Sequence, residues 1–258
     1  MKIIGIIPAR MNSFRFKGKP LEKLLGIPMI GHCYMRSKMC KDLMDVYVAT
    51  CDKEIFDYVV SIGGKAIMTS NKHERASDRT AEAMLKIEQE LRCKFDIVVM
   101  IQGDEPMLKP SMISESFTPI IKEKNIKVTN LMSEIDDMSE FEDPNEVKVV
   151  VNKRNEAIYF SREAIPSQKK YDKKITKLKQ VCIISFERDF LLRFNNMDQT
   201  PLEIIESVDM MRVIENDVIV KMALTGTKTW SVDTEEDLKR VEKKMKNDNL
   251  IKNYKKIL

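Results

Sequence analysis

A cluster of cationic side chains follows the first apolar segment of the sequence. Arg10, Arg15, Lys17 and Lys19 fall within a loop of ten residues between an expected strand and an expected helix. Several cations and loop N–H groups around one point suit a triphosphate, because the negative charge of each phosphate has to be neutralised. The loop has neither the G-x-x-x-x-G-K-S/T pattern of a P-loop nor the G-x-G-x-x-G pattern of dinucleotide-binding folds. From charge alone, a phosphate site and a solvated basic loop are equally supported.

Carboxylates stand at the edges of two later segments. Gln102-Gly103-Asp104-Glu105-Pro106 comes directly after the apolar run 97–101, and Asp233 precedes an expected helix. Carboxylates at the carboxyl end of a strand commonly hold a hard divalent cation beside phosphate oxygens. The same residue types also form ordinary turns, and Thr234 with Asp237 has capping-box spacing that accounts for those two residues. A cation site and plain turn structure therefore both stay open.

One further arginine and the scarcity of histidine bear on the chemistry. Arg162 follows an expected strand in a polar turn, where it could bind a carboxylate through two hydrogen bonds, although a surface arginine is the commoner outcome. The sequence has two histidines, His32 and His73, which argues against a histidine metal site and against a Ser-His-Asp triad. His32 lies within an apolar helical segment, so we expect it to be packed in the core or at an interface.

The elements that position these residues alternate between strands and helices in the first half of the chain. Strands are expected at 3–7, 46–49, 65–68 and 97–101, and helices from near Pro28 to 38, from an Asp52 cap to Gly63-Gly64, and from a Ser77 cap to 91. Short apolar strands separated by helices are typical of a parallel sheet that is covered on both faces. The expected fold is therefore α/β, with a doubly wound, mostly parallel, Rossmann-like sheet that binds ligands at the carboxyl ends of its strands.

The second half has a different pattern. The segments 147–151 and 157–160, joined by 152–155, predict a β-hairpin. Further strands are expected at 181–186 and 218–224, and helices at 201–212 and 234–246. Because no repeat and no Pro/Gly/Ser-rich linker divides the sequence, we expect one domain over 1–258, with 134–200 as a lid or dimerisation region.

Composition limits the class of protein. The 258 residues include 44 Lys and Arg against 40 Asp and Glu, a net charge of +4, which does not resemble the single-sign field of a nucleic-acid coat. No apolar stretch approaches the ~18–20 residues of a membrane span, and the N-terminal apolar run is too short for a signal peptide. The five cysteines form no C-x-x-C pair, as expected for reduced thiols. These features predict a cytoplasmic protein without nucleic-acid or membrane partners.

Taken in order, the segments resemble one family. The series I-I-P-A-R-x-x-S-x-R-x-x-G-K-P-L, A-T-x-D, Q-G-D-E-P, Y-F-S-R-x-x-I-P and V-D-T-x-E-D-L is similar to that of the CMP-Kdo synthetases, which activate 3-deoxy-D-manno-octulosonate (Kdo), and it extends from Ile4 to Lys246. The resemblance implies a nucleotidyltransferase fold and a cytoplasmic, Mg²⁺-dependent homodimer in lipopolysaccharide or capsule biosynthesis. In that reaction the anomeric hydroxyl of the sugar acid attacks the α-phosphorus of CTP and pyrophosphate leaves, without a covalent enzyme intermediate.

The resemblance also implies roles for individual residues. It assigns catalysis to Arg10, Lys19 and Asp104, and Mg²⁺ to Asp104 and Asp233. The family's G-T-E-R-like segment reads Ala76-Ser77-Asp78-Arg79 here. The implied nucleotide-binding residues are Ala9, Arg10, Ser13, Arg15, Lys19, Ser77, Arg79, Gln102 and Asp104. The implied sugar-acid-binding residues are Gln102, Arg162, Gln180 and Glu206, with Arg162 as the partner of the sugar carboxylate.

The expected sugar pocket departs from the family pattern. Where the family reads K-H-x-G-I-Y-x-Y, this chain has Gln180 for the histidine and Ile184 and Phe186 for tyrosines, and Met210 replaces a glutamine in L-E-Q-L-R. Fewer donors predict a less polar pocket, so the acceptor is expected to be Kdo, a related ulosonate, or another acid such as a nonulosonic acid or a phosphonate. A non-catalytic nucleotide-binding protein is the alternative of another class, although retention of both metal carboxylates argues against it.

Overall fold

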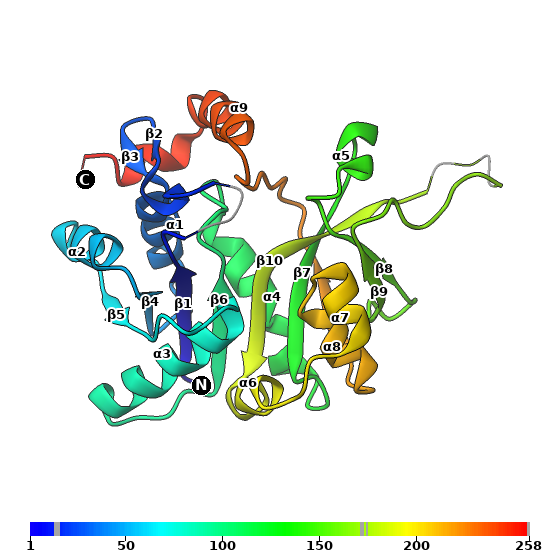
Figure 1. Cartoon of the computed structure of the whole chain (residues 1–258), viewed down its shortest axis with the longest axis horizontal. Helices are drawn as coiled ribbons and strands as arrows, with labels where there is room; N and C mark the ends of the chain where they lie inside the picture. Colours follow the sequence, from blue (N-terminus) through cyan, green and yellow to red (C-terminus); the bar gives the residue numbers. More distant parts are fainter. Residues whose placement is uncertain (13–15, 171–172, 174, 257–258) are drawn as a thin grey trace. The chain divides into compact units, whose positions relative to one another are not determined.

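The computed structural model describes the whole chain except residues 13–15, 171–172, 174 and 257–258. The described residues form two compact units, residues 1–114 with 229–258 and residues 115–228, and we treat each by itself (Figure 1). Helix α4 (Pro110–Lys122) contains the boundary between them. No helix among the described residues has both the length and the apolar character that a bilayer crossing requires.

The first unit contains a parallel sheet whose strands run in the order β6-β1-β4-β5. Its strands are β1 (Ile3–Ala9), β4 (Asp45–Thr50), β5 (Ala66–Met68) and β6 (Ile97–Ile101). Ile6 of β1 lies opposite Tyr47 on one side and Met100 on the other, and every residue of β6 is buried. The apolar runs in the sequence therefore predicted these strands correctly, because strands in the middle of a covered parallel sheet have no solvent face.

Helices and short elements complete the described part of the first unit. They are α1 (Met29–Lys38), α2 (Lys53–Ser61), α3 (Ala76–Leu91) and α9 (Glu235–Met245), with the short elements η1 (Lys19–Leu21), β2 (Lys23–Leu24), β3 (Ile27–Pro28) and η2 (Asn249–Asn253). The first three contact β1 or β4. The predicted capping box of α9 is confirmed, since Thr234 accepts from the Asp237 N–H and Asp237 accepts from the Thr234 N–H.

One predicted helix cap is wrong, and another is correct in position but not in its hydrogen bond. Helix α3 starts two residues earlier than expected, with Arg75 at the cap position, so Ser77 lies inside the first turn and is buried. Asp52 does occupy the cap position of α2, but its side chain makes no cap hydrogen bond. Its carboxylate instead accepts a hydrogen bond from the Met11 N–H at 2.7 Å. A residue type that favours a cap can thus be used to hold a distant loop.

A buried polar network joins α1 to the C-terminal segment of the first unit. His32 Nε2 lies 2.8 Å from the Leu24 carbonyl and His32 Nδ1 lies 2.7 Å from the Tyr254 hydroxyl. Because a carbonyl only accepts, Nε2 carries the proton and Nδ1 accepts from the hydroxyl. Arg36 donates to the same hydroxyl oxygen at 2.9 Å and pairs with Asp248. The expectation that His32 is a packed residue is confirmed.

This network predicts a loss of stability in mild acid. Burial, with a contribution from Arg36, lowers the pKa of His32 from 6.5 to about 4. The unfolded chain therefore takes up a proton below pH 6.5 that the folded protein refuses until about pH 4, so the contribution of His32 is complete above pH 6.5 and is lost as the pH falls. By linkage the loss should reach about 2 kcal/mol at pH 5. Urea unfolding at pH 7.5 and pH 5 measures it.

The control for that prediction is His32→Gln, which keeps a hydrogen-bonding side chain that does not titrate. The variant should lose less stability than the original protein between the two pH values. Equal losses in both proteins would show that other groups cause the acid sensitivity.

The second unit has a mixed sheet. Strand β7 (Val128–Glu134) pairs in parallel with β11 (Val220–Leu224) and antiparallel with β10 (Leu178–Glu187). The predicted hairpin is confirmed as β8 (Lys148–Val151) and β9 (Ala157–Ser161), and β8 also pairs with β10. Helices α5 (Met138–Glu142), α6 (Arg188–Asn195), α7 (Pro201–Glu206) and α8 (Met210–Glu215) complete this unit. The α/β class with mostly parallel strands is confirmed, and the lid or dimerisation role of 134–200 stays a prediction.

The helix expected over 201–212 is wrong, because it is two helices. Ser207 ends α7 in the left-handed region, with φ of +53°, and α8 starts at Met210. The two helices are joined by a buried ion pair in which Arg212 Nε and Nη2 donate to the two carboxylate oxygens of Glu203 at 2.7 and 2.6 Å. Arg212 also donates to the Phe194 carbonyl at 3.1 Å. The arginine therefore holds three helices of this unit together.

Candidate active site

The predicted metal carboxylates meet at one lysine. Lys19 Nζ lies 3.1 Å from Asp104 Oδ2, 3.3 Å from Asp233 Oδ1 and 2.9 Å from the Val232 carbonyl oxygen. The three side chains keep only 13–19% of their surface exposed. Residues far apart in the sequence, all within the first unit, thus form one compact charged cluster, and we call Lys19, Asp104 and Asp233 the Lys19 cluster.

Local backbone structure holds the Lys19 cluster in place. Gly18 adopts φ of +78°, a conformation that suits glycine, and η1 starts at Lys19 directly after it. The Val232 N–H donates to the Asp104 carbonyl at 3.0 Å, which places the segment before α9 against the end of β6. Gly103 packs against α1, where an added Cβ would come within 3.2 Å of Ile30 Cδ1. The lysine and both aspartates are therefore positioned by backbone contacts as well as by their charges.

Electrostatics keep Lys19 protonated. Burial is the largest single influence and lowers its pKa, but the charges and hydrogen bonds of Asp104 and Asp233 together outweigh it, so the pKa is raised above the usual value for lysine. At neutral pH Lys19 therefore carries its positive charge between the two aspartate side chains. A pair of carboxylates can hold a divalent cation, and an ammonium beside them can bind the oxyanions of a triphosphate. These are the roles that the resemblance implies.

The N-terminal loop closes on itself beside the end of β1. The Gly18 N–H donates to the Met11 carbonyl at 2.9 Å, while the Met11 N–H donates to Asp52. Ala9 is buried at the end of β1, and Arg10 after it is exposed. Ser13 and Arg15 lie outside the described residues. The structure thus shows how the loop is anchored at both of its ends.

Two other predicted nucleotide residues are buried near the start of α3. Ser77 keeps 1% and Arg79 keeps 3% of its surface exposed. The Arg79 guanidinium donates to the Thr69 hydroxyl and to the Ser70 carbonyl, the latter at 3.2 Å. Arg79 therefore holds the loop that follows β5 through hydrogen bonds to two of its residues. Gln102, in contrast, lies half-buried directly after β6, beside Asp104 in the sequence.

Two predicted sugar-acid residues of the second unit bind each other. Glu206 accepts from the Arg162 N–H at 2.9 Å and from the Ser161 hydroxyl at 2.9 Å. Arg162 Nε donates to the Glu206 carbonyl at 2.8 Å and Arg162 Nη1 donates to the Pro144 carbonyl at 2.9 Å. The structure therefore brings the two residues together and uses the arginine to join backbone segments.

The positions that depart from the family pattern fall mostly in the core of the second unit. Ile184, Phe186 and Met210 keep 3%, 0% and 0% of their surface exposed. Gln180 is half-buried and donates to Asn130 Oδ1. Asn130 in turn donates to the Val181 carbonyl at 2.7 Å, where the pairing of β10 with β7 shifts register. The expectation of a less polar pocket therefore rests on Gln180 alone, since the other three side chains present almost no surface.

Comparison with known proteins decides the family. A family model described as cytidylyltransferase matches residues 4–224. The chain belongs to the cytidylyltransferase family. Proteins named 3-deoxy-manno-octulosonate cytidylyltransferase from Geobacter metallireducens and Thermodesulfovibrio yellowstonii are 38% and 41% identical to it. Those alignments cover 95% and 94% of this chain and 98% of each relative.

Solved structures agree with this assignment of the cytidylyltransferase. The structure of CMP:2-keto-3-deoxy-manno-octonic acid synthetase complexed with CTP superposes with a TM-score of 0.86 at 35% identity, over 95% of this chain and 99% of that one. A cytidylyltransferase from Leptospira borgpetersenii has a TM-score of 0.60 at 17% identity and covers 100% of this chain and 96% of its own. The second comparison shows the fold alone. The expected nucleotidyltransferase fold is confirmed.

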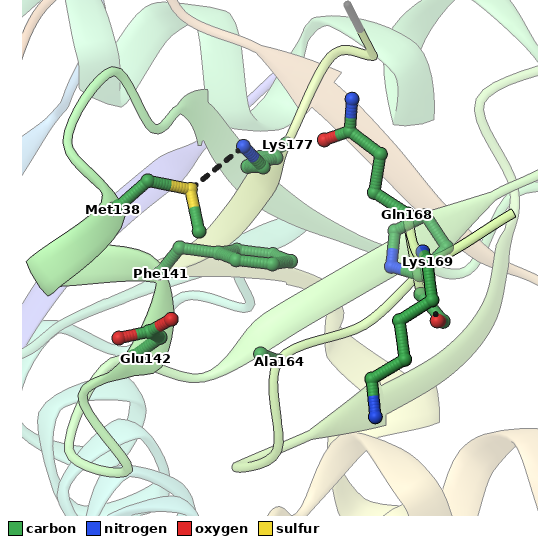
Figure 2. Close-up of a pocket in the computed structure, with 9 residues that line it drawn as sticks. Met138, Phe141, Glu142, Ala164, Gln168, Lys169 and Lys177 are labelled. Atoms are coloured by element: carbon green, nitrogen blue, oxygen red, sulfur yellow. Dashed lines mark hydrogen bonds between the residues drawn. The ribbon is translucent and has the colours of Figure 1, made fainter. Parts of the chain in front are cut away.

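The second unit of the cytidylyltransferase also contains a pocket of 430 Å³. Figure 2 shows Met138, Phe141 and Glu142 on one side of it and Gln168 and Lys169 on the other. None of the predicted site residues that the structure describes lines this pocket. It is therefore separate from the residues to which the sequence assigned chemistry.

Sequence reasoning missed the role of Asp52 in the cytidylyltransferase. The A-T-x-D segment and its place directly after a strand both marked the residue, and the helix expected after it made Asp52 a cap candidate. No role in holding the cationic loop was assigned to it, although Asp52 follows β4 and the cationic loop follows the neighbouring strand β1. Carboxyl ends of adjacent parallel strands lie at one edge of the sheet.

Asp52 therefore predicts an effect on nucleotide affinity. Asp52→Ala removes the acceptor of the Met11 N–H, and a hydrogen bond to a charged group contributes about 1.5–3 kcal/mol. We expect the affinity for CTP, measured by calorimetry, to fall by about tenfold or more because the loop is no longer anchored. Asp52→Asn keeps an acceptor oxygen and should stay within about threefold of the original protein. Unchanged affinity in Asp52→Ala would show that the loop does not depend on this contact.

Proposed function

We propose that this cytidylyltransferase couples CTP to Kdo and releases pyrophosphate. The observation that carries the proposal is the convergence of Lys19, Asp104 and Asp233 at one point of the first unit, in a chain whose relatives at 38% and 41% identity are named for this reaction. A binding-only protein has no need to keep two carboxylates and an ammonium together out of water, where their desolvation is costly.

The chemistry requires charge neutralisation and alignment. The anomeric hydroxyl of the sugar acid loses its proton to solvent and attacks the α-phosphorus. The bond between that phosphorus and the bridging oxygen breaks, and pyrophosphate leaves with its electron pair. No covalent intermediate with the protein is needed, so catalysis depends on positioning and on stabilising the negative charge that shifts to the leaving oxygens. Lys19 and the exposed Arg10 supply cations for the triphosphate in this proposal.

The residues present suit a magnesium ion. The described residues contain no group of three or more His, Cys, Asp or Glu side chains that could hold a metal by themselves. Mg²⁺ does not need one, because it usually takes one or two carboxylates together with waters and substrate phosphate oxygens. Asp104 and Asp233 would hold it, and the ion would neutralise phosphate charge when bound.

We also propose that Kdo is the sugar acid, that the protein is a homodimer and that it works in the cytoplasm. Ile184, Phe186 and Met210 are buried, so their departure from the family pattern gives no argument for a different acceptor, and Kdo is the acceptor that the relatives' name supports. Light scattering after size exclusion tests the dimer, which rests on the resemblance described above. The expected mass is twice the 30.0 kDa of the chain.

The decisive experiment measures pyrophosphate release with CTP and Mg²⁺ and a panel of acceptors. The panel contains Kdo, its amino analogue, a nonulosonic acid and a phosphonate. We expect Kdo to be used with the highest kcat/KM. Release with another acceptor alone would keep the nucleotide chemistry and reassign the sugar. Absence of release with every acceptor, together with CTP binding in calorimetry, would favour a nucleotide-binding protein instead.

A further inference from the structure

We infer that Lys19 occupies the place of the divalent cation in the free protein and gives up the two carboxylates when the metal and CTP bind. This inference rests on the proposed magnesium site and goes beyond it, because it assigns Lys19 two successive sets of partners. It predicts that the free protein binds divalent cations weakly and that the nucleotide promotes their binding.

The hydrogen bonds of Lys19 carry the first step. An ammonium has three N–H donors and no acceptor. Its nitrogen has three acceptors within 3.3 Å, namely Asp104 Oδ2, Asp233 Oδ1 and the Val232 carbonyl. Each donor is therefore already used within the protein. Lys19 can contact a triphosphate only if it releases at least one of these partners.

The second step is competition for the same oxygens. Mg²⁺ binds oxygen ligands at about 2.0–2.1 Å and would take them from the same two carboxylates that now accept from Lys19, each through one oxygen. A divalent cation on Asp104 and Asp233 would also stand close to an ammonium that is largely out of water, where repulsion between cations is much stronger than in bulk solvent. Metal and Lys19 therefore compete for the two carboxylates, and each weakens the binding of the other.

The third step is the compensation that the nucleotide provides. A triphosphate brings several oxyanions, and each can accept from an ammonium that has left its carboxylates. Binding of the nucleotide thus removes the cost of displacing Lys19, and the metal can then take the carboxylates. By thermodynamic linkage, the factor by which CTP raises metal affinity equals the factor by which the metal raises CTP affinity.

The test measures Mn²⁺ binding to the free protein without substrates, by electron paramagnetic resonance of the unbound ion. Lys19→Met should bind Mn²⁺ about tenfold or more tightly than the original protein, because the competing cation is gone. Lys19→Gln is the second variant and should show the same direction, and circular dichroism and urea unfolding show which variants are folded. Lys53→Met is the matched control, because it removes the same charge from a side chain that is 81% exposed and pairs with Asp57 rather than with Asp104 and Asp233.

Specificity for the carboxylate pair comes from a combined variant. Adding Asp104→Asn to Lys19→Met should abolish the gain in Mn²⁺ affinity. Tight Mn²⁺ binding by the original protein without CTP, or equal affinities in the original protein and both Lys19 variants, would overturn the inference. A gain of the same size in Lys53→Met would overturn it too, because it would reflect net charge alone. These readouts need no turnover, so failure of the proposed function would appear separately, as absence of pyrophosphate release.

Discussion

Asp104→Asn is expected to lower kcat/KM for CTP by about a thousandfold, a change on the scale seen when one group that stabilises transition-state charge is removed. Asp104 is at once a partner of Lys19 and a proposed ligand of the metal, and its carbonyl accepts from the Val232 N–H. The substitution keeps the size of the side chain and its backbone contact but removes the charge. Pyrophosphate release at varied Mg²⁺ measures the effect.

The control for Asp104 is Asp57→Asn, at an aspartate of α2 that is 55% exposed and pairs only with an exposed lysine in the described contacts. It should leave kcat/KM unchanged. A loss of less than about tenfold in Asp104→Asn would mean that Asp104 neither holds the metal nor orients Lys19 for the reaction. Partial recovery at high Mg²⁺ would instead support its role as a metal ligand.

Glu203→Gln is expected to lower the free energy of unfolding by about 3–5 kcal/mol, because it leaves the Arg212 guanidinium charged and buried without its counter-ion. Glu203 and Arg212 keep 0% and 4% of their surface exposed, and the guanidinium also lies 4.5 Å from the centre of the Phe194 ring. Urea unfolding at pH 7 gives the value. The loss should appear as a lower midpoint with little change in slope.

The double variant Glu203→Leu with Arg212→Met tests the cause. Replacing both members of a buried ion pair by apolar side chains of similar volume is often nearly neutral. The double variant should therefore be more stable than Glu203→Gln. If it is less stable, the hydrogen bonds of Arg212 to the Phe194 carbonyl, and not the unpaired charge, account for the loss.

Strands were predicted well where burial has a simple pattern. The segment Ile97–Ile101 was predicted to the residue, since a strand with both faces covered consists of apolar side chains only. Strand β7 was missed although it also lies between two partners. It contains the buried polar residues Thr129, Asn130 and Ser133, so neither an apolar run nor a two-residue alternation marks it.

The site was predictable to the level of residue types and motif order. The sequence placed Lys19, Asp104 and Asp233 among the site residues, but only the structure shows that one ammonium joins both carboxylates. The break at Ser207 had no glycine or proline to signal it. The ion pair of Glu203 with Arg212, which joins the helices on its two sides, is visible only in the folded chain.

The first unit consists of residues 1–114 and 229–258, so the ribosome completes it only after it has made the whole of the second unit. Lys19 precedes Asp233 by 214 residues, so at about 5–20 residues per second the ribosome needs roughly ten to forty seconds to deliver the second carboxylate. During that interval the nascent chain has made the whole parallel sheet and all of 115–228, while η1 still lacks the segment that fixes it. Assembly of the Lys19 cluster is thus among the last events in the synthesis of the first unit, and a chain that ends before residue 229 would lack Asp233 and could not form the cluster.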